Sequence, residues 1–205
     1  MHRLKSILVL LALAALGAAT VAFAGPDRDR EDGDRGHRGD HRGGWHVKQE
    51  RRHARNARAA LIDAQGRRVG RVHLRQRRRD GSVWVVARVR DLPPGFHGFH
   101  IHTVGKCEPP TFTTAGGHLN PEGTTHRDHA GDLPTLLVNR DGKGFIATTT
   151  DRFAVADLRD ADGSAVMVHE LPDNYANIPE RYGGPDQDTL TTGDAGSRLA
   201  CGEVR

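Results

Sequence analysis

Residues 95–102 read Gly-Phe-His-Gly-Phe-His-Ile-His, and this stretch indicates both the type of fold and the chemistry that the fold supports. His100 and His102 lie two residues apart in a run that is typical of a β-strand. Because side chains alternate between the two faces of a strand, both imidazoles point the same way. Ile101 between them points the opposite way, into a core. Two imidazoles on one face of a rigid strand make half of a transition-metal site.

The rest of the chain from residue 57 onward is also typical of strands. The stretch 96–102 and seven others have strand character, and turn signals such as Asp80-Gly81 separate several of them. The other stretches are 57–63, 69–77, 82–89, 133–139, 144–150, 165–169 and 199–204. About eight strands in roughly 150 residues, with no strong amphipathic helix between them, predict an all-β domain built as one antiparallel sandwich or barrel.

The N-terminus has the form of a secretory signal peptide over residues 1–24. A basic start with Arg3 and Lys5 precedes an apolar run that ends in small residues, which predicts cleavage after Ala24. The alternative is an uncleaved N-terminal anchor. No other segment is apolar and long enough to span a bilayer, so we expect no stable membrane anchor after cleavage. A secreted or periplasmic protein is predicted.

Residues 25–56 differ from the rest in composition. They are rich in Arg, Asp, Gly and His and poor in apolar residues, which predicts a disordered tail. Its histidines are His37, His41, His46 and His53. Clustered imidazoles can gather copper, nickel or zinc loosely, but a charged tail can also serve only as a solubilising linker, and both interpretations stay open. The folded domain is predicted over residues 57–205.

The charge of the chain is nearly balanced. Its 30 lysines and arginines stand against 26 aspartates and glutamates, a net charge of +4. Much of the basic charge lies in the mixed-charge tail, so we expect no nucleic-acid partner.

Two cysteines, Cys107 and Cys201, stand in or beside two long stretches that lack strand character, 103–132 and 170–198. An even cysteine count behind a secretory leader predicts one disulfide, and two free buried thiols are the alternative. Long loops in a compact domain are usually functional or disordered. Because both loops are rich in residues that bind metals, we predict that they are functional.

The residues between the cysteines complete a pattern that resembles the secreted bacterial copper/zinc superoxide dismutases. Besides residues 95–102, the shared motifs are Gly117-His-Leu-Asn-Pro121, His129-Ala-Gly-Asp-Leu-Pro134, Val168-His169 and Gly193-Asp-Ala-Gly-Ser-Arg-Leu-Ala-Cys-Gly202. The resemblance covers about residues 57 to 205. It implies a Greek-key, immunoglobulin-like sandwich or barrel with two long functional loops.

The resemblance also implies a role for each site residue. Copper would be held by His100, His102, His118 and His169, and zinc by His118, His126, His129 and Asp132. His118 would bridge the two metals. Asp173 would orient one histidine of each metal, and Arg198 would attract the anionic substrate. The implied reaction is the dismutation of superoxide to dioxygen and hydrogen peroxide as copper cycles between Cu(II) and Cu(I), with His118 as the proton carrier.

The sequence departs from the family at one point. His126 and His129 are only three residues apart, where the family usually has a longer stretch, although a short His-x-x-His can still reach one metal from a tight turn. The short spacing leaves a copper-only dismutase open. A non-enzymatic copper-binding or copper-delivery protein on the same scaffold, with the histidine-rich tail as its main feature, also stays open. The sequence also leaves both a monomer and a homodimer open.

Overall fold

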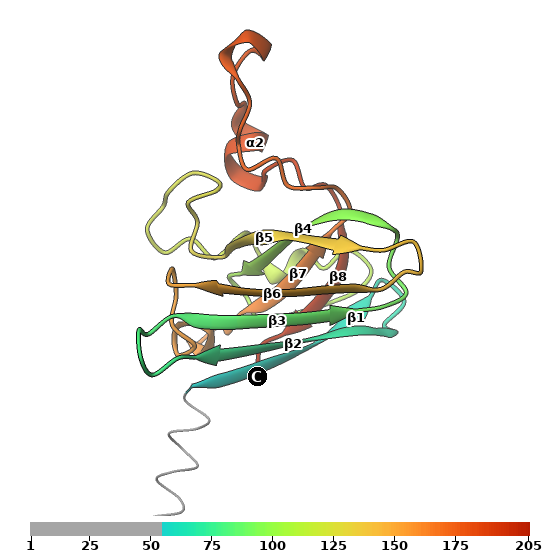
Figure 1. Ribbon diagram of the computed structural model, residues 1–205, viewed down its shortest axis with the longest axis vertical. Coiled ribbons are helices and arrows are strands. Elements are labelled where there is room, and N and C mark those ends of the chain that lie inside the picture. The colour runs from blue at the N-terminus through green and yellow to red at the C-terminus, as the bar shows by residue number, and fades with distance from the viewer. Residues whose placement is uncertain (1–54) are drawn as a thin grey trace, which may run out of the picture. The chain divides into compact units, whose positions relative to one another are not determined.

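The computed structural model describes residues 55–205, which form a β-barrel with two long loops (Figure 1). The eight strands in these residues are β1 (Asn56–Asp63), β2 (Arg68–Gln76), β3 (Val83–Val89), β4 (Gly95–His102), β5 (Asp132–Val138), β6 (Gly144–Thr150), β7 (Ala165–His169) and β8 (Arg198–Glu203). The helices are the short 3₁₀ turns η1 (Thr113–Ala115), η2 (Asp157–Arg159) and η3 (Glu180–Tyr182), and the α-helix α2 (Gln187–Thr192). Every predicted strand is present, with bounds that differ by one residue at most.

The strands close into a ring in the order β1-β2-β3-β6-β5-β4-β7-β8, and all neighbours are antiparallel. The order is of the Greek-key type, because β3 pairs with β6 rather than with β4, which follows it in the chain. The predicted antiparallel all-β fold is thus confirmed, in the form of a closed barrel. Closure gives every strand a neighbour on both sides, although β5 and β6 pair only at Val138 and Gly144.

The barrel interior is filled by the inward side chains of alternating positions. In β1, for example, Ala57, Ala59 and Leu61 are buried, and the residues between them are exposed. Phe99 and Ile101 of β4 are fully buried in this core. His100 and His102 therefore lie on the outer face of β4, as the alternation predicts.

A second, smaller apolar cluster lies outside the barrel wall. It contains Phe112, Ala115, Ala165, Met167 and Cys201. It joins the loop 103–131 to the outer faces of β7 and β8, and it explains why all five residues of β7 are buried. The loop is therefore packed against the wall that carries the histidines of β4 and β7.

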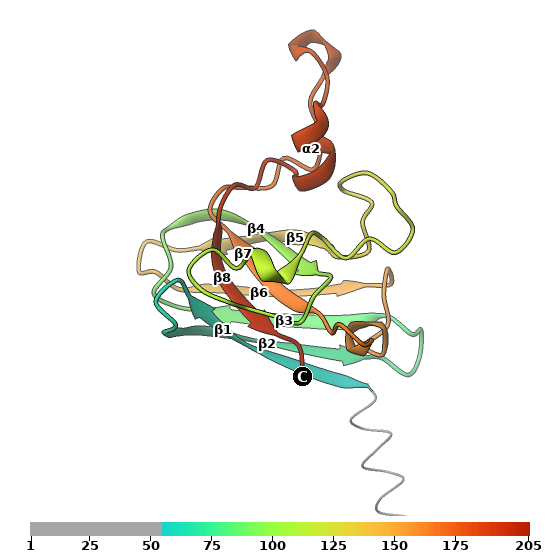
Figure 2. The same cartoon turned by 180° about the vertical axis from the view of Figure 1, so that it is seen from behind.

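The disulfide predicted from the sequence is present. Cys107 in the loop 103–131 is bonded to Cys201 on β8, with Cα atoms 5.6 Å apart and a sequence separation of 94. This excludes the alternative of two free thiols. The bond ties the loop to β8 on the side of the barrel seen in Figure 2.

The predicted leader and nearly all of the predicted tail lie outside the described residues. Asn56, which we placed at the end of the tail, is already the first residue of β1. Within residues 55–205, no helix has the length and apolar character needed to cross a membrane.

Candidate metal centre

Four histidines from three segments of the chain meet outside the barrel wall. His100 and His102 lie on β4, His169 ends β7, and His118 lies in the loop 103–131, where it forms an isolated β-bridge with His102. Each offers one ring nitrogen, and these four nitrogens all lie within 4.8 Å of one another. All four side chains are buried. We call these residues the first metal group.

Hydrogen bonds to carbonyl groups determine which nitrogen is free in two of these rings. The Nδ1–H of His102 donates to the carbonyl oxygen of Gly116 at 2.9 Å, and the Nδ1–H of His169 donates to that of Gly196 at 3.0 Å. Because a carbonyl oxygen can only accept, the proton of each neutral ring is on Nδ1. Each Nε2 then carries a lone pair.

These two Nε2 atoms face each other at 3.3 Å. Burial, together with neighbouring charges, lowers the pKa of His169 to about 3 and the pKa of His102 well below its usual value, so both rings are neutral near pH 7. Neither ring has a second proton, and the contact is therefore not a hydrogen bond but two opposed lone pairs. A metal cation bound by both nitrogens would turn this repulsion into coordination.

His100 brings a third free nitrogen to the same place. Its Nε2–H donates to Oδ2 of Asp173 at 2.7 Å, whereas its Nδ1 is buried and has no hydrogen-bond partner among the described residues. Burial outweighs the effect of Asp173 and lowers the pKa of His100 to about 4, so this ring is neutral as well. A buried acceptor without a partner costs about 1–3 kcal/mol, which a bound metal would offset.

A second metal group lies beside the first and shares His118 with it. Its members are His118, His126, His129 and Asp132. Oδ1 of Asp132 lies 2.9 Å from Nδ1 of His118 and 3.3 Å from Nδ1 of His129. Oδ2 lies 3.2 Å from Nδ1 of His126, and that nitrogen is buried without a hydrogen bond. Three imidazoles and one carboxylate are an ordinary donor set for a closed zinc site.

A tight turn brings His126 and His129 together despite their short spacing. Arg127 between them has a φ of 69°, in the left-handed region, and the amide of Asp128 donates to the carbonyl of Thr125 at 3.0 Å. The guanidinium of Arg152 donates to the carbonyl oxygens of Arg127 and His129, the latter at 3.2 Å. Arg152 thereby closes the turn from the side of β6.

The second group favours a positive charge. Burial alone would lower the pKa of His126, but the negative charges of Asp132 and Asp173 and the hydrogen bond to Asp173 raise it to about 9. Burial would likewise raise the pKa of both carboxyls, yet the histidines hold each well below its usual range. A cation between these two buried carboxylates is therefore electrostatically stabilised, as a bound dication would be.

Asp173 connects the two groups. Its Oδ2 accepts from Nε2 of His100 at 2.7 Å, and its Oδ1 accepts from Nε2 of His126 at 2.8 Å and from the amide of Tyr175 at 2.7 Å. A carboxylate that holds the far nitrogen of a metal-binding histidine fixes the orientation and tautomer of that ring. The structure thus places Asp173 in contact with one histidine of each group.

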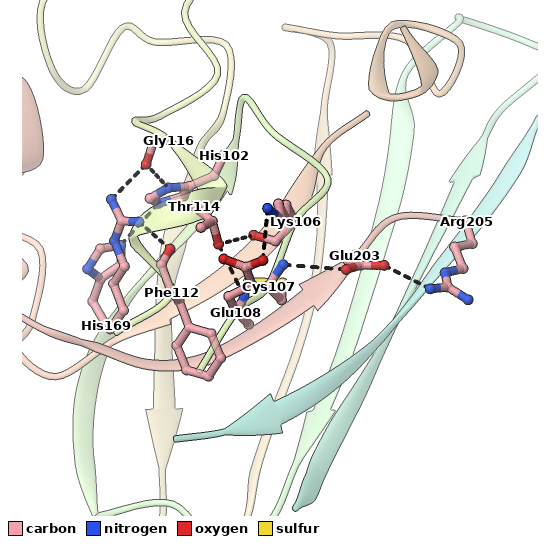
Figure 3. The surroundings of a disulfide bond; sticks show 12 residues. His102, Lys106, Cys107, Glu108, Phe112, Thr114, Gly116, His169, Glu203 and Arg205 are labelled. Carbon is pink, nitrogen blue, oxygen red and sulfur yellow. Dashed lines mark hydrogen bonds and ion pairs between the residues drawn. A yellow bond between two sulfur atoms is a disulfide. The ribbon is translucent and has the colours of Figure 1, made fainter. Parts of the chain in front are cut away.

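Arg198 lies next to the first group, half-buried at the start of β8. Its guanidinium donates to the carbonyl oxygens of Phe112 at 2.5 Å and Gly116 at 2.6 Å. The Gly116 carbonyl is the one that also holds His102, and Figure 3 shows Phe112, Gly116, His102 and His169 close together beside the disulfide. One loop carbonyl therefore positions both the guanidinium of Arg198 and the ring of His102.

The sequence matches the family model described as copper/zinc superoxide dismutase over residues 68–204, two thirds of the chain. The chain belongs to this family. Its membership agrees with the barrel and with the pair of metal groups.

Individual relatives in the dismutase family support the same assignment. A protein of Mycolicibacterium paratuberculosis named superoxide dismutase [Cu-Zn] is 48% identical over 130 residues, 55% of this chain and 57% of that protein. One of Escherichia coli K12 with the same name is 38% identical over 130 residues, 57% of this chain and 68% of that protein. The chain spans little more than half the length of the mycobacterial relatives.

Two solved structures share the fold of this dismutase family member. A SOD-like protein from Bacillus subtilis has a TM-score of 0.58 at 31% identity and covers 71% of this chain and 96% of its own. The clock protein EA4 has a TM-score of 0.61 at 29% identity and covers 74% of this chain and 94% of its own.

Three residues of the centre were not found by sequence reasoning: Gly116, Arg152 and Gly193. Gly116 acts through its own backbone carbonyl, and Arg152 donates to the backbone carbonyls of other residues. Every residue type offers such carbonyls, so the sequence holds no signal for these contacts. Gly193 ends α2 with a φ of 61°. Its signal was its place at the start of a motif shared with the dismutases.

We predict that Gly193→Ala disrupts the second metal group. A Cβ at this position would lie 2.2 Å from Oδ1 of Asp173 and 2.3 Å from Nε2 of His126. Both side chains would have to move away from it, which breaks the hydrogen bond between His126 and Asp173. The expected result is loss of most bound zinc and a free energy of unfolding lower by about 1–3 kcal/mol. Elemental analysis and urea denaturation measure the two effects.

Gly183→Ala is the matched control, because Gly183 also has a positive φ, 98°, but no atom lies within 4 Å of the added Cβ. It should show backbone strain alone and keep its zinc. Equal zinc content in the two variants would contradict the steric argument.

Proposed function

We propose that the protein dismutes superoxide to dioxygen and hydrogen peroxide. Copper would be bound by the first metal group and zinc by the second. The observation that supports this most is the pair of opposed Nε2 lone pairs of His102 and His169, 3.3 Å apart, beside a second donor set that shares His118. When bound, copper supplies the one-electron chemistry of the Cu(II)/Cu(I) couple that dismutation needs.

His118 is proposed to bridge the metals and to carry a proton. Its Nδ1 faces Asp132 and His129, which leaves Nε2 for the first group. A ring held at Nδ1 keeps its place while Nε2 takes up a proton and delivers it to the peroxide product. The second group would thus hold His118 in position and tune its basicity, which is the usual work of a closed structural zinc site.

A zinc-containing enzyme is favoured over a copper-only dismutase by the geometry of the short turn. The turn closed by Arg152 brings all four donors of the second group within 4.8 Å of one another. Metal analysis of the purified protein decides between the two, since about one zinc per chain is expected in the first case and none in the second.

Arg198 is proposed to attract superoxide and hold it near the first group. Its guanidinium is half-buried and fixed by two carbonyls, so its charge stays in place without reorganisation. The described residues outside β1–β3 carry more acidic than basic side chains. The attraction must therefore be local, and it should weaken as salt screens it.

Arg198→Ala is predicted to lower kcat/KM for superoxide about 10- to 100-fold while copper stays bound. Arg198→Lys should recover part of the lost kcat/KM, because lysine restores the positive charge but not the planar guanidinium with its paired N–H donors. Arg181→Ala changes an exposed arginine in the segment between β7 and β8; it is the control and should change little. Superoxide decay by pulse radiolysis and copper analysis give the result. Unchanged turnover in Arg198→Ala would contradict the proposed role of Arg198. Bound copper without turnover in the parent protein would favour the copper-binding alternative.

The proposal includes the division of the chain into segments and the compartment in which the protein works. We propose a signal peptide at 1–24, a charged histidine-rich tail from residue 25 to the start of β1, a catalytic domain from β1 to residue 205, and a secreted or periplasmic protein. The Cys107–Cys201 disulfide supports an oxidising compartment. A homodimer and the role of the tail stay predictions that the described residues do not test.

A further inference from the structure

The charge of the folded domain is sharply divided along the chain. Residues 55–90, which contain β1, β2 and β3, have 11 arginines, two aspartates and no lysine or glutamate, a net charge of +9. Residues 91–205 have nine lysines and arginines against 17 aspartates and glutamates, a net charge of −8. The nearly balanced net charge of the folded domain is therefore the sum of a strongly basic segment, residues 55–90, and an acidic remainder. Such asymmetry is typical of proteins that bind polyanions.

The basic part is one wall of the barrel, away from the metal groups. In the closed ring, β2 is four strands from β4 in either direction, so β2 and the histidine-bearing β4 lie on opposite sides. Figure 1 shows β1, β2 and β3 side by side on the side away from α2. A ligand on this wall would leave the metal centre accessible.

The wall ends in a cleft of about 900 Å³ at the hairpin between β2 and β3. Arg75, Trp84 and Thr149 form a cross-strand row that lines it, since Arg75 pairs with Trp84 and Trp84 with Thr149. Four further arginines line the cleft: Arg55, Arg77, Arg78 and Arg79. All five arginines are exposed, and the indole of Trp84 is 44% exposed.

These guanidinium groups are largely free to bind a ligand. Among the described residues, Arg77 alone of the five has a carboxylate neighbour, Asp80 at 3.7 Å, and that pair is exposed. Guanidinium forks bind carboxylate, sulfate and phosphate groups with two hydrogen bonds each. An exposed indole adds a flat apolar face beside them.

We propose that this cleft and wall bind an anionic polysaccharide, with its acidic groups on Arg75, Arg78 and Arg79 and a sugar ring on Trp84. A cleft suits a chain that enters it better than it suits a flat bilayer. The choice of polysaccharide over nucleic acid rests on the proposed export of the protein. Bound in this way, the protein is held on an anionic polymer with its metal centre facing away from it.

The test measures binding of the full purified chain to dextran sulfate and polygalacturonate, with neutral dextran, single-stranded DNA and phosphatidylglycerol vesicles for comparison. We expect binding to both acidic polysaccharides that falls with added salt, and none to neutral dextran. The triple variant Arg75→Ser, Arg78→Ser, Arg79→Ser should bind at least about tenfold more weakly. Trp84→Ala should also weaken binding, although it leaves the net charge unchanged.

The matched control is Arg140→Ser, Lys143→Ser, Arg181→Ser, which removes the same three charges from outside the wall and should lose no more than about twofold. Equal losses in the two triple variants would overturn the site, because net charge alone would then explain binding. Tighter binding to DNA or to vesicles than to either polysaccharide would overturn the class of ligand. Copper content and superoxide decay should stay unchanged in all these variants, so a failure here is distinguishable from a failure of the proposed enzyme.

Discussion

His118→Ala is expected to release metal from both groups at once and to reduce superoxide decay to the uncatalysed background. His118 is the residue that the two groups share, so its loss leaves three donors in each. It also removes the partner of Asp132, whose charge would remain buried beside His126 and His129. Copper and zinc content by elemental analysis, and dismutation by pulse radiolysis, measure the effect.

Three companion variants make this prediction sharp. His102→Ala removes a donor from the first group alone and should reduce copper while zinc stays bound. His126→Ala removes a donor from the second group alone and should reduce zinc while copper stays bound. His73→Ala, an exposed histidine of β2, should change neither metal. If His118→Ala lost only one metal, the two groups would not share this ring, and the proposed bridge would be wrong.

The strands were predictable because their signal is local. Alternation of buried and exposed positions along β1 and β2 follows directly from the pleat, so bounds and faces could be read from the sequence. The order of the strands was not readable in this way. That β3 pairs with β6 and that β1 pairs with β8 to close the ring depend on contacts between residues far apart in sequence, which no short pattern encodes.

The candidate site was also predictable from the sequence only where its signal is local. The alternation placed His100 and His102 on one face, but the complete ligand sets came from the family resemblance rather than from spacing. The contacts that orient the rings were not predictable, since they use the carbonyl oxygens of Gly116 and Gly196. The segregation of charge was also missed. It was present in the sequence, but its meaning depends on β1, β2 and β3 being neighbours in the barrel.

Removal of the disulfide is expected to have the largest effect on stability. The bond closes a loop of 94 residues, which on the chain-entropy model contributes about 4–5 kcal/mol to the free energy of unfolding. The double variant Cys107→Ala, Cys201→Ala should lose about that amount in urea denaturation. Alanine suits Cys201, which is fully buried in an apolar cluster, better than serine does.

The same variant should lose activity in excess of its loss of copper. Without the bond, the loop near Cys107 is held by weaker polar contacts, such as the amide of Cys107 to Glu203 at 3.4 Å (Figure 3). That loop carries the Phe112 and Gly116 carbonyls that fix Arg198, so the guanidinium loses its position when the loop moves.

Reduction of the parent protein with dithiothreitol is the internal control. It should bring the parent to the unfolding free energy and kcat/KM of the double variant, and the double variant itself should not respond. A variant that unfolds within about 1 kcal/mol of the oxidised parent would contradict the loop-closure argument. A stable variant with full copper and reduced kcat/KM would separate the two roles of the bond, since it would show that Cys107 acts on the reaction through Arg198 rather than through global stability.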